Sequence, residues 1–216
     1  MNIALPDDLQ RWHAIFEKAV SQIEAVDPGH DINHIKRVVN SAVQFANQEG
    51  ANMQVVLPAA WLHDCVQVSK ASRLRSQASQ LAAGKATELL SEWGYQADLL
   101  PAIAHAIEAH SYSANIPCQT LEAQIVQDAD RMDALGAIGI ARTLLVGASF
   151  GNPLTFHEDP FCYHRTPDDK AAIIDHFYTK LLKLKDSFHT RAALQEASKR
   201  HQFMQQYLSQ LEDELT

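Results

Sequence analysis

Apolar residues recur at intervals of three and four along almost the whole chain, and no convincing two-residue alternation interrupts them. Residues at these intervals share one face of a helix, so the pattern predicts amphipathic helices, whereas half-buried strands would need alternation. The pattern runs through the ranges 9–23, 35–46, 53–66, 81–93, 99–110, 120–148, 173–184 and 194–211. The chain is therefore expected to be all-α.

One domain is the expected organisation. The chain has 216 residues, of which 46% are hydrophobic, and this is enough to bury one full core. We expect a single helical domain over 1–216, with a core over about 8–148 and a C-terminal helical extension over 168–213. The range 149–167 between them has no periodic pattern and is typical of a long ordered loop.

Local signals indicate where helices begin, end or break. Asp168 is placed to cap the helix that follows the loop. Pro58 is compatible with a helix over 53–66 if it lies near the first turn. Gly136 and Gly139 allow either close helix packing or a break between two helices within the long segment that contains them.

Composition narrows the class of partner. The formal net charge is -8 and the pI is about 5.7, which argues against a broad basic face for a nucleic acid polymer. A small anionic substrate remains compatible, because a bound cation offsets local repulsion. The chain has three cysteines and no Cys-x-x-Cys, so neither a disulfide framework nor a thiolate zinc site is indicated. Without an apolar leader or a long apolar run, we expect a cytoplasmic protein with no membrane association, and a homodimer remains open.

The adjacent pair His63 and Asp64 ends the most apolar segment of the chain. Burying an imidazole and a carboxylate there would cost several kcal/mol unless something pairs them, and a cation would satisfy both. The alternative is a helix end that faces solvent. That alternative fits poorly, because a carboxylate is disfavoured at the C-terminus of a helix.

Two further positions are candidates for the same site. His34 shares a helical face with Val38 and is expected to point inward, either as a hydrogen-bonded core residue or as a ligand. Asp130 follows an apolar run and shares a stripe with Val126, although a cluster of acidic residues is more often a solvated face. Asp128 remains an alternative to Asp130 as the inward carboxylate.

In chain order on an all-helical sequence, His34, the pair His63 and Asp64, and Asp130 resemble the HD domain family of metal-dependent phosphohydrolases. The flanking context resembles the short stand-alone bacterial HD proteins, among them members that hydrolyse nucleoside triphosphates. The segments that carry this resemblance are 29–38, 61–64, 109–111, 126–136, 158–170 and 175–184. The resemblance therefore covers most of the chain.

The resemblance implies an HD-type helical bundle with additional C-terminal helices and a divalent cation held by His34, His63, Asp64 and Asp130. Imidazole and carboxylate ligands suit Mn, Mg, Fe, Ni, Co or Zn rather than Ca. The implied activity is cleavage of a phosphoester or phosphoanhydride bond by metal-activated water, with a nucleotide or deoxynucleotide as the leading substrate and Asp64 as the catalytic carboxylate. Gln67 departs from the HD nucleotidases that carry a Glu base at this position.

A phosphate substrate needs hydrogen-bond donors near the metal. The candidates are Lys70, Arg75, His110 and Arg131, with His110 the strongest because it lies on the inward face of its helix. A core or surface role is the alternative reading for each of them. His105 lies on a different face of the same helix and is not expected to contribute.

Three other functions are compatible with the sequence. One is hydrolysis of a signalling nucleotide of the guanosine polyphosphate type, which would require a purine pocket. Another is a metal-stabilised regulatory or binding module without turnover, although the intact set of four ligands argues against it. The last is an all-helical structural protein whose buried polar residues bond one another.

Overall fold

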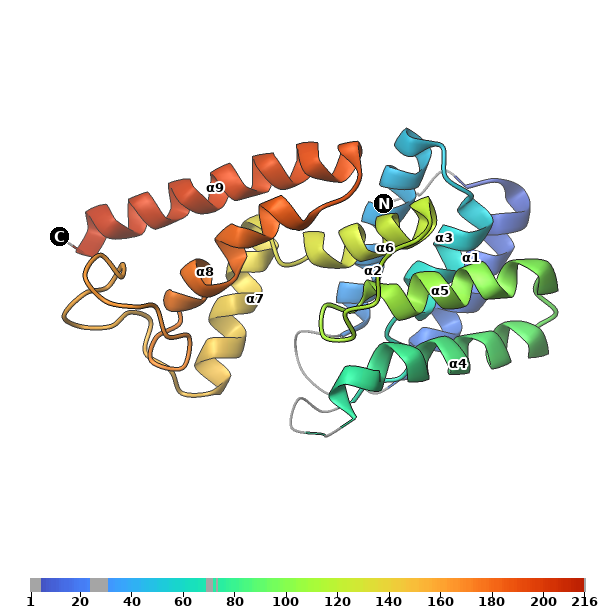
Figure 1. Cartoon of the computed structure of the whole chain (residues 1–216), viewed down its shortest axis with the longest axis horizontal. Helices are drawn as coiled ribbons and strands as arrows, with labels where there is room; N and C mark the ends of the chain where they lie inside the picture. Colours follow the sequence, from blue (N-terminus) through green and yellow to red (C-terminus); the bar gives the residue numbers. More distant parts are fainter. Residues whose placement is uncertain (1–4, 24–30, 69–71, 73, 216) are drawn as a thin grey trace. The chain divides into compact units, whose positions relative to one another are not determined.

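The computed structural model describes residues 5–23, 31–68, 72 and 74–215. These residues form helices and no strand, which confirms the predicted all-α class (Figure 1). The helices are α1 (Asp7–Val20), α2 (Ile32–Glu49), α3 (Met53–Leu62), η1 (Arg75–Gln77), α4 (Ala78–Glu92), η2 (Ala97–Leu99), α5 (Leu100–His110), α6 (Leu121–Met132), α7 (Gly136–Ser149), α8 (Asp175–Thr179), η3 (Leu181–Ser187) and α9 (Arg191–Leu215).

The chain divides into two compact units. The first consists of Met1–Asp130 together with His189–Ala192, and the second of Arg131–Phe188 together with Ala193–Thr216. Helices α1 to α5 lie in the first unit, and α7, α8 and η3 lie in the second. The short segment His189–Ala192 thus belongs with helices far away in the sequence.

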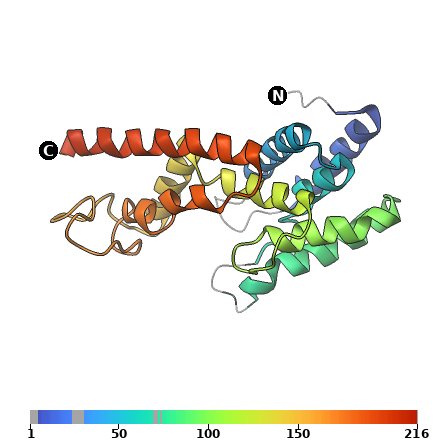
Figure 2. The same ribbon diagram turned by 45° about the horizontal axis from the view of Figure 1, so that its top comes forward.

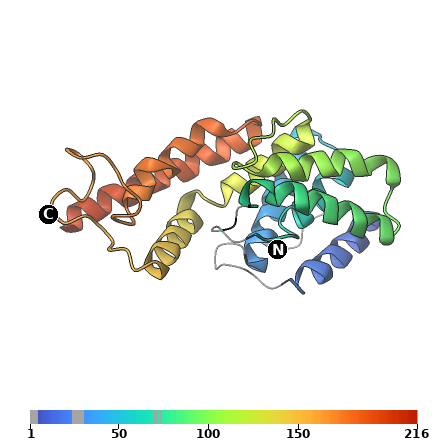
Figure 3. The ribbon, with the colours of Figure 1, turned by 60° about the horizontal axis from the view of Figure 1, so that its bottom comes forward.

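Helix α3 is the core of the first unit. Its residues from Val55 to Leu62 are all buried, and it packs against α1, α2, α4 and α5. Helices α4 and α5 lie side by side beside it, as Figures 2 and 3 both show. A helix that is apolar on every side can be stable only when it is surrounded in this way.

Pro58 lies in the interior of α3 rather than in its first turn. A proline has no N–H, so the carbonyl four residues earlier, that of Gln54, receives no helical hydrogen bond from it. The Tyr95 hydroxyl donates to the Gln54 carbonyl oxygen at 2.7 Å and supplies the missing bond. A partner from outside the helix thus permits the proline at this position.

The two glycines of the long segment mark a break between helices. Helix α6 ends at Met132, and α7 begins at Gly136, whose φ of 71° is in the left-handed region. A Cβ on Gly139 would lie 2.2 Å from the Ala134 carbonyl oxygen. Both glycines are therefore required by the turn that separates α6 from α7.

In the second unit, residues 150–174 form neither helix nor strand, so the irregular segment is longer than the predicted loop. Asp168 does not cap a long helix; its side chain accepts the Lys170 N–H at 3.0 Å in a local turn. The Ile173 and Ile174 amides donate to the Pro153 and Leu154 carbonyls, each at 3.0 Å. These amides are engaged by the loop, and the first helical turn is delayed to Asp175.

Among the described residues, no single helix is long and apolar enough to cross a membrane. Helices α6 and α7 together are long and apolar enough by length and composition alone, but the chain bends by 60° at the break between them.

Candidate metal centre

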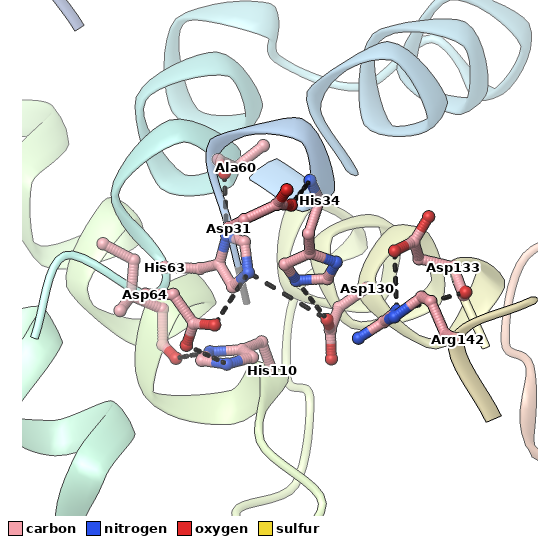
Figure 4. A network of polar contacts seen from close by, with 10 residues as sticks. Asp31, His34, Ala60, His63, Asp64, His110, Asp130, Asp133 and Arg142 are labelled. Carbon is pink, nitrogen blue, oxygen red and sulfur yellow. Dashed lines mark hydrogen bonds and ion pairs between the residues drawn. The ribbon is translucent and has the colours of Figure 1, made fainter. Parts of the chain in front are cut away.

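Five side chains from four parts of the first unit converge in one cluster (Figure 4). They are His34 near the start of α2, His63 and Asp64 just after α3, His110 at the end of α5, and Asp130 in α6. Two overlapping groups have ligand atoms that all lie within 4.8 Å of one another. These groups are His34, His63 and Asp130, and His63, Asp64 and His110.

His63 is the centre of the cluster and is fully buried. Its Nδ1 lies 2.8 Å from the Ala60 carbonyl oxygen, which can only accept, so Nδ1 carries the proton and Nε2 presents a lone pair. Nε2 has no hydrogen-bond partner among the described residues, and its nearest charged neighbours are carboxylates of Asp64 at 3.7 Å and Asp130 at 4.0 Å. A buried lone pair that faces two carboxylates fits a cation.

Burial also fixes the charge state of His63. Desolvation lowers its pKa below the ordinary value of 6.5, and the neighbouring imidazoles of His110 and His34 act in the same direction against the carboxylates. The neutral imidazole is the form that binds a metal ion. The protonation state that the site requires is therefore the state that the fold favours.

His110 repeats the arrangement of His63. Its Nδ1 donates to the Ile107 carbonyl oxygen at 2.6 Å, and its Nε2 lies 3.8 Å from Asp64 Oδ1. Its ring lies edge-on to that of His63, with centroids 4.9 Å apart. The structure thus brings His110 together with the predicted ligand pair.

His34 reaches the cluster because of the way in which α2 begins. The Asp31 carboxylate caps the helix by accepting the His34 N–H at 2.8 Å, which places His34 in the first turn. The side chain is buried, and its Nε2 lies 3.4 Å from Asp130 Oδ1. The inward orientation expected from the helical pattern is what the structure shows.

Asp130 and Asp128 are separated by two positions, about 200° around a helix, so their side chains point to different sides. Asp130 faces the imidazoles of His34 and His63. Burial alone would raise its pKa, but these imidazoles and that of His110 outweigh it and hold the pKa of Asp130 below its usual range. The carboxylate of Asp130 is therefore ionised beside the imidazoles.

Asp128 is buried and faces a different set of groups. Its carboxylate accepts the backbone N–H groups of His189 at 3.0 Å and Thr190 at 2.9 Å, and the Thr190 hydroxyl at 2.8 Å. Burial raises its pKa despite these donors. The structure places Asp130, and not Asp128, among the imidazoles.

The structure does not bring the other predicted donors into the cluster within the part of the chain that it describes. Lys70 lies outside the described residues, and so does the side chain of Arg75. The Arg131 guanidinium donates to the Ser187 carbonyl oxygen at 2.6 Å, within the second unit. Asp133, close to Asp130 in the sequence, forms an ion pair with Arg142 at 2.6 Å.

Gln127 is a buried polar residue next to the site that sequence reasoning did not identify. Its side chain joins the Ala109 carbonyl to His189, which is 62 residues away in the sequence. No local signal marks it, because its neighbours along the helix face are Ala123, Gln124, Asp130 and Arg131. Only the fold shows which distant groups the amide meets.

Comparisons with known proteins agree with this geometry. The model of the HD domain family matches residues 31–135. The uncharacterized protein YpgQ of Bacillus subtilis is 32% identical over 192 residues, which cover 87% of this chain and 85% of YpgQ. An HD-superfamily hydrolase from Bacillus thuringiensis has a similar structure, with a TM-score of 0.74, 35% identity and coverage of 95% of this chain and 97% of that one.

The structure of YpgQ in complex with ADP is also similar, with a TM-score of 0.70, 29% identity and coverage of 95% of this chain and 93% of that one. The matched family region contains all five residues of the cluster. Because the family model matches the region that holds the cluster, and the HD-superfamily hydrolase is 35% identical over most of both chains, the protein belongs to the HD domain family.

Proposed function

We propose that the protein is a metal-dependent phosphohydrolase that cleaves a phosphoester or phosphoanhydride bond of a nucleotide or deoxynucleotide. The observation that carries this proposal is the buried Nε2 lone pair of His63, which faces the carboxylates of Asp64 and Asp130. His34, His63, Asp64 and Asp130 would hold a divalent cation of the Mn, Mg, Fe, Ni, Co or Zn kind. The similar HD-superfamily hydrolase supports the reaction class.

When bound, such a cation lowers the pKa of a ligating water and stabilises charge on phosphoryl oxygens. Two carboxylates of the chain have different roles beside such a cation. Asp64 is partly exposed, so its carboxylate can orient a water molecule and accept its proton. Asp130 is held by His34 and contributes charge at a fixed position.

His110 is the best-placed donor to a substrate phosphate. Its Nδ1 proton is committed to the Ile107 carbonyl, so Nε2 can donate only as part of an imidazolium. Asp64 Oδ1 lies 3.8 Å from this nitrogen. A phosphate oxygen would then accept a charge-assisted hydrogen bond, which is about twice as strong as a neutral one. Lys70, Arg75 and Arg131 remain predicted donors.

The nucleotide class is supported by a relative. The YpgQ chain that binds ADP matches 95% of this chain. The phosphates of a nucleoside diphosphate offer both the charge that a cation attracts and the oxygens that His110 would contact. A nucleotide is therefore the substrate class to test first.

The test is a panel of purified protein with Mn²⁺ or Mg²⁺ and dNTPs, NTPs, nucleoside monophosphates, a guanosine polyphosphate and an artificial phosphodiester. We expect turnover of at least one nucleotide, abolished by Asp64→Ala. Stoichiometric metal with no turnover on the whole panel would instead indicate a binding module. Absence of bound metal, with no effect of Mn²⁺ on melting, would count against any metal-dependent function.

A further inference from the structure

A buried amide connects the cluster to a distant segment of the chain. The Gln127 Nε2 donates to the Ala109 carbonyl oxygen at 2.6 Å, and the Gln127 Oε1 lies 2.7 Å from His189 Nε2. A carbonyl oxygen can only accept, so the first contact fixes the orientation of the amide. His189 must then carry a proton on Nε2 and donate it to Gln127.

The bond to Ala109 lies at the end of α5, immediately before His110. The last carbonyls of a helix receive no hydrogen bond from within the helix, and Ser111, with φ -75° and ψ 127°, no longer continues α5. Gln127 therefore supplies a donor that the end of α5 needs. Gln127 also lies one turn before Asp130 in α6. It therefore links the backbone next to His110 to the helix that carries Asp130.

His189, which bonds the oxygen of the Gln127 amide, is itself fixed by hydrogen bonds of its backbone. Asp128 accepts both backbone N–H groups of His189 and Thr190, so the chain at His189 is fixed next to the Gln127 amide. The Ala192 N–H donates to the Glu49 carboxylate at 2.6 Å, which fixes the far end of the segment. All these groups belong to the first unit. The segment His189–Ala192 thus forms part of the structure behind His110.

We propose that Gln127 is a positioning residue, which holds the end of α5 so that the His110 imidazole faces Asp64, and that His189 holds the Gln127 amide in the required orientation. The proposal rests on the proposed function only for the role of His110. It predicts that Gln127 and His189 affect the site through His110 and not independently of it.

The test is a double-mutant cycle with Gln127→Met, which keeps the length of the side chain, and His110→Ala. Residues that act on a site from behind its ligands typically contribute about 10–100-fold. We expect Gln127→Met to reduce kcat/KM on the nucleotide that the panel identifies by about tenfold or more, with the same split between kcat and KM as His110→Ala. In the His110→Ala background the same change should cost less than about twofold.

His189→Ala is the second variant, since this side chain is exposed and its loss should leave folding intact. We expect a smaller reduction in kcat/KM, which also disappears in the His110→Ala background. Gln124→Leu, one turn earlier on α6 and only half-buried, is the matched control and should leave activity and melting unchanged. Multiplicative effects of Gln127→Met and His110→Ala would overturn the proposal.

The two proposals fail in different ways. If the wild-type protein turns over nothing in the panel, the proposed function fails, and the same cycle is then measured on ADP affinity in the presence of Mn²⁺ by calorimetry. Dependence of the Gln127 effect on His110 would still support positioning. Independent effects, or a wild-type protein that also fails to bind ADP, would overturn it.

Discussion

At the scale of single residues, the two carboxylates of α6 differ in what surrounds them. Asp130 faces the imidazoles of His34 and His63, which hold its pKa below the usual range, and its carboxylate is placed to bind a cation. Asp128 faces three hydrogen-bond donors, two backbone N–H groups and the Thr190 hydroxyl, and these donors pair it without any ion. The same residue type thus serves two purposes within one turn of helix.

We predict that Asp130→Ala reduces Mn²⁺ affinity by more than about 100-fold, beyond the effect of residues that merely support a ligand. Calorimetric titration measures this affinity. His105 accepts the Gln119 N–H at its Nε2, away from the cluster, so His105→Ala is the control and should retain affinity and activity.

Asp128→Ala is expected to lower the free energy of unfolding rather than the Mn²⁺ affinity. It removes the acceptor of three buried hydrogen bonds, and hydrogen bonds to a charged group contribute about 1.5–3 kcal/mol each. We predict a loss of about 3 kcal/mol or more in the free energy of unfolding, measured in urea. Mn²⁺ affinity lost to the same degree as in Asp130→Ala would contradict this assignment of roles.

The sequence could predict the cluster only in part. His63 and Asp64 follow from an apolar helix that ends on two polar residues, and the resemblance to HD proteins identifies His34 and Asp130. The choice between Asp130 and Asp128 depends on His189 and Thr190, which no local pattern connects to α6. Contacts between distant segments decide such choices.

At the scale of helices and turns, local sequence patterns predicted which segments are helical better than they predicted where each helix begins and ends. The apolar period predicted each of the long helices. The pattern did not predict that α8 has only five residues, because the amides of Ile173 and Ile174 are engaged by the loop. It also did not predict the Tyr95 hydroxyl, whose hydrogen bond to the Gln54 carbonyl makes Pro58 tolerable. Periodicity records which face is buried, and it carries no information on these bonds.

The turn between α6 and α7 gives a sharp test with a matched control. A Cβ on Gly139 would overlap the Ala134 carbonyl, whereas nothing lies within 4 Å of a Cβ on Gly84 in α4. We predict that Gly139→Ala lowers the free energy of unfolding by about 1–3 kcal/mol. Gly84→Ala should raise it by about 0.5–1 kcal/mol. Thermal and urea unfolding measure both, and equal effects would contradict the close approach.

The long loop depends on a buried ion pair. Both Arg165 nitrogens NH1 and NH2 donate to Asp175, one of them at 2.6 Å, and the Asp168 N–H donates to the same carboxylate at 2.7 Å. Removal of one partner from a buried pair costs about 3–5 kcal/mol. We predict that Asp175→Asn lowers the free energy of unfolding by about 3 kcal/mol and accelerates proteolysis within 150–174.

Acid should weaken the same loop. Burial would raise the pKa of Asp175, but Arg165 and the Asp168 N–H outweigh it and hold the pKa below the ordinary 3.8. The contribution of the pair is therefore complete above that value and is lost as the pH falls through the lower pKa of the folded protein. Proteolysis rates below pH 4 should rise in the wild type and stay flat in Asp175→Asn.

At the scale of the whole molecule, a ligand that binds only the folded chain stabilises it by mass action. A cation at 100 times its dissociation constant contributes about 2.7 kcal/mol. We predict that Mn²⁺ raises the melting temperature, that a chelator reverses the rise, and that His63→Ala abolishes it. A rise that persists in His63→Ala would mean that the cation binds elsewhere.

The pH dependence of stability without metal has a definite sign. Burial lowers the pKa of His63 below 6.5, so near that pH the folded chain binds fewer protons than the unfolded chain. The contribution of His63 is complete above pH 6.5 and declines as the pH falls toward the lower pKa of the folded state. Burial lowers the pKa of His13 and His201 as well, so they add slope of the same sign.

Protons also compete with the cation for the His63 lone pair. The stabilisation by Mn²⁺ should therefore shrink as the pH falls below 6.5 toward the lowered pKa of His63, in addition to the decline of the metal-free protein. Melting temperatures with and without Mn²⁺ across this range separate the two effects. In His63→Ala the Mn²⁺ effect should vanish at every pH, while the slope due to His13 and His201 remains. A Mn²⁺ effect that grows on acidification would contradict a neutral imidazole as the ligand.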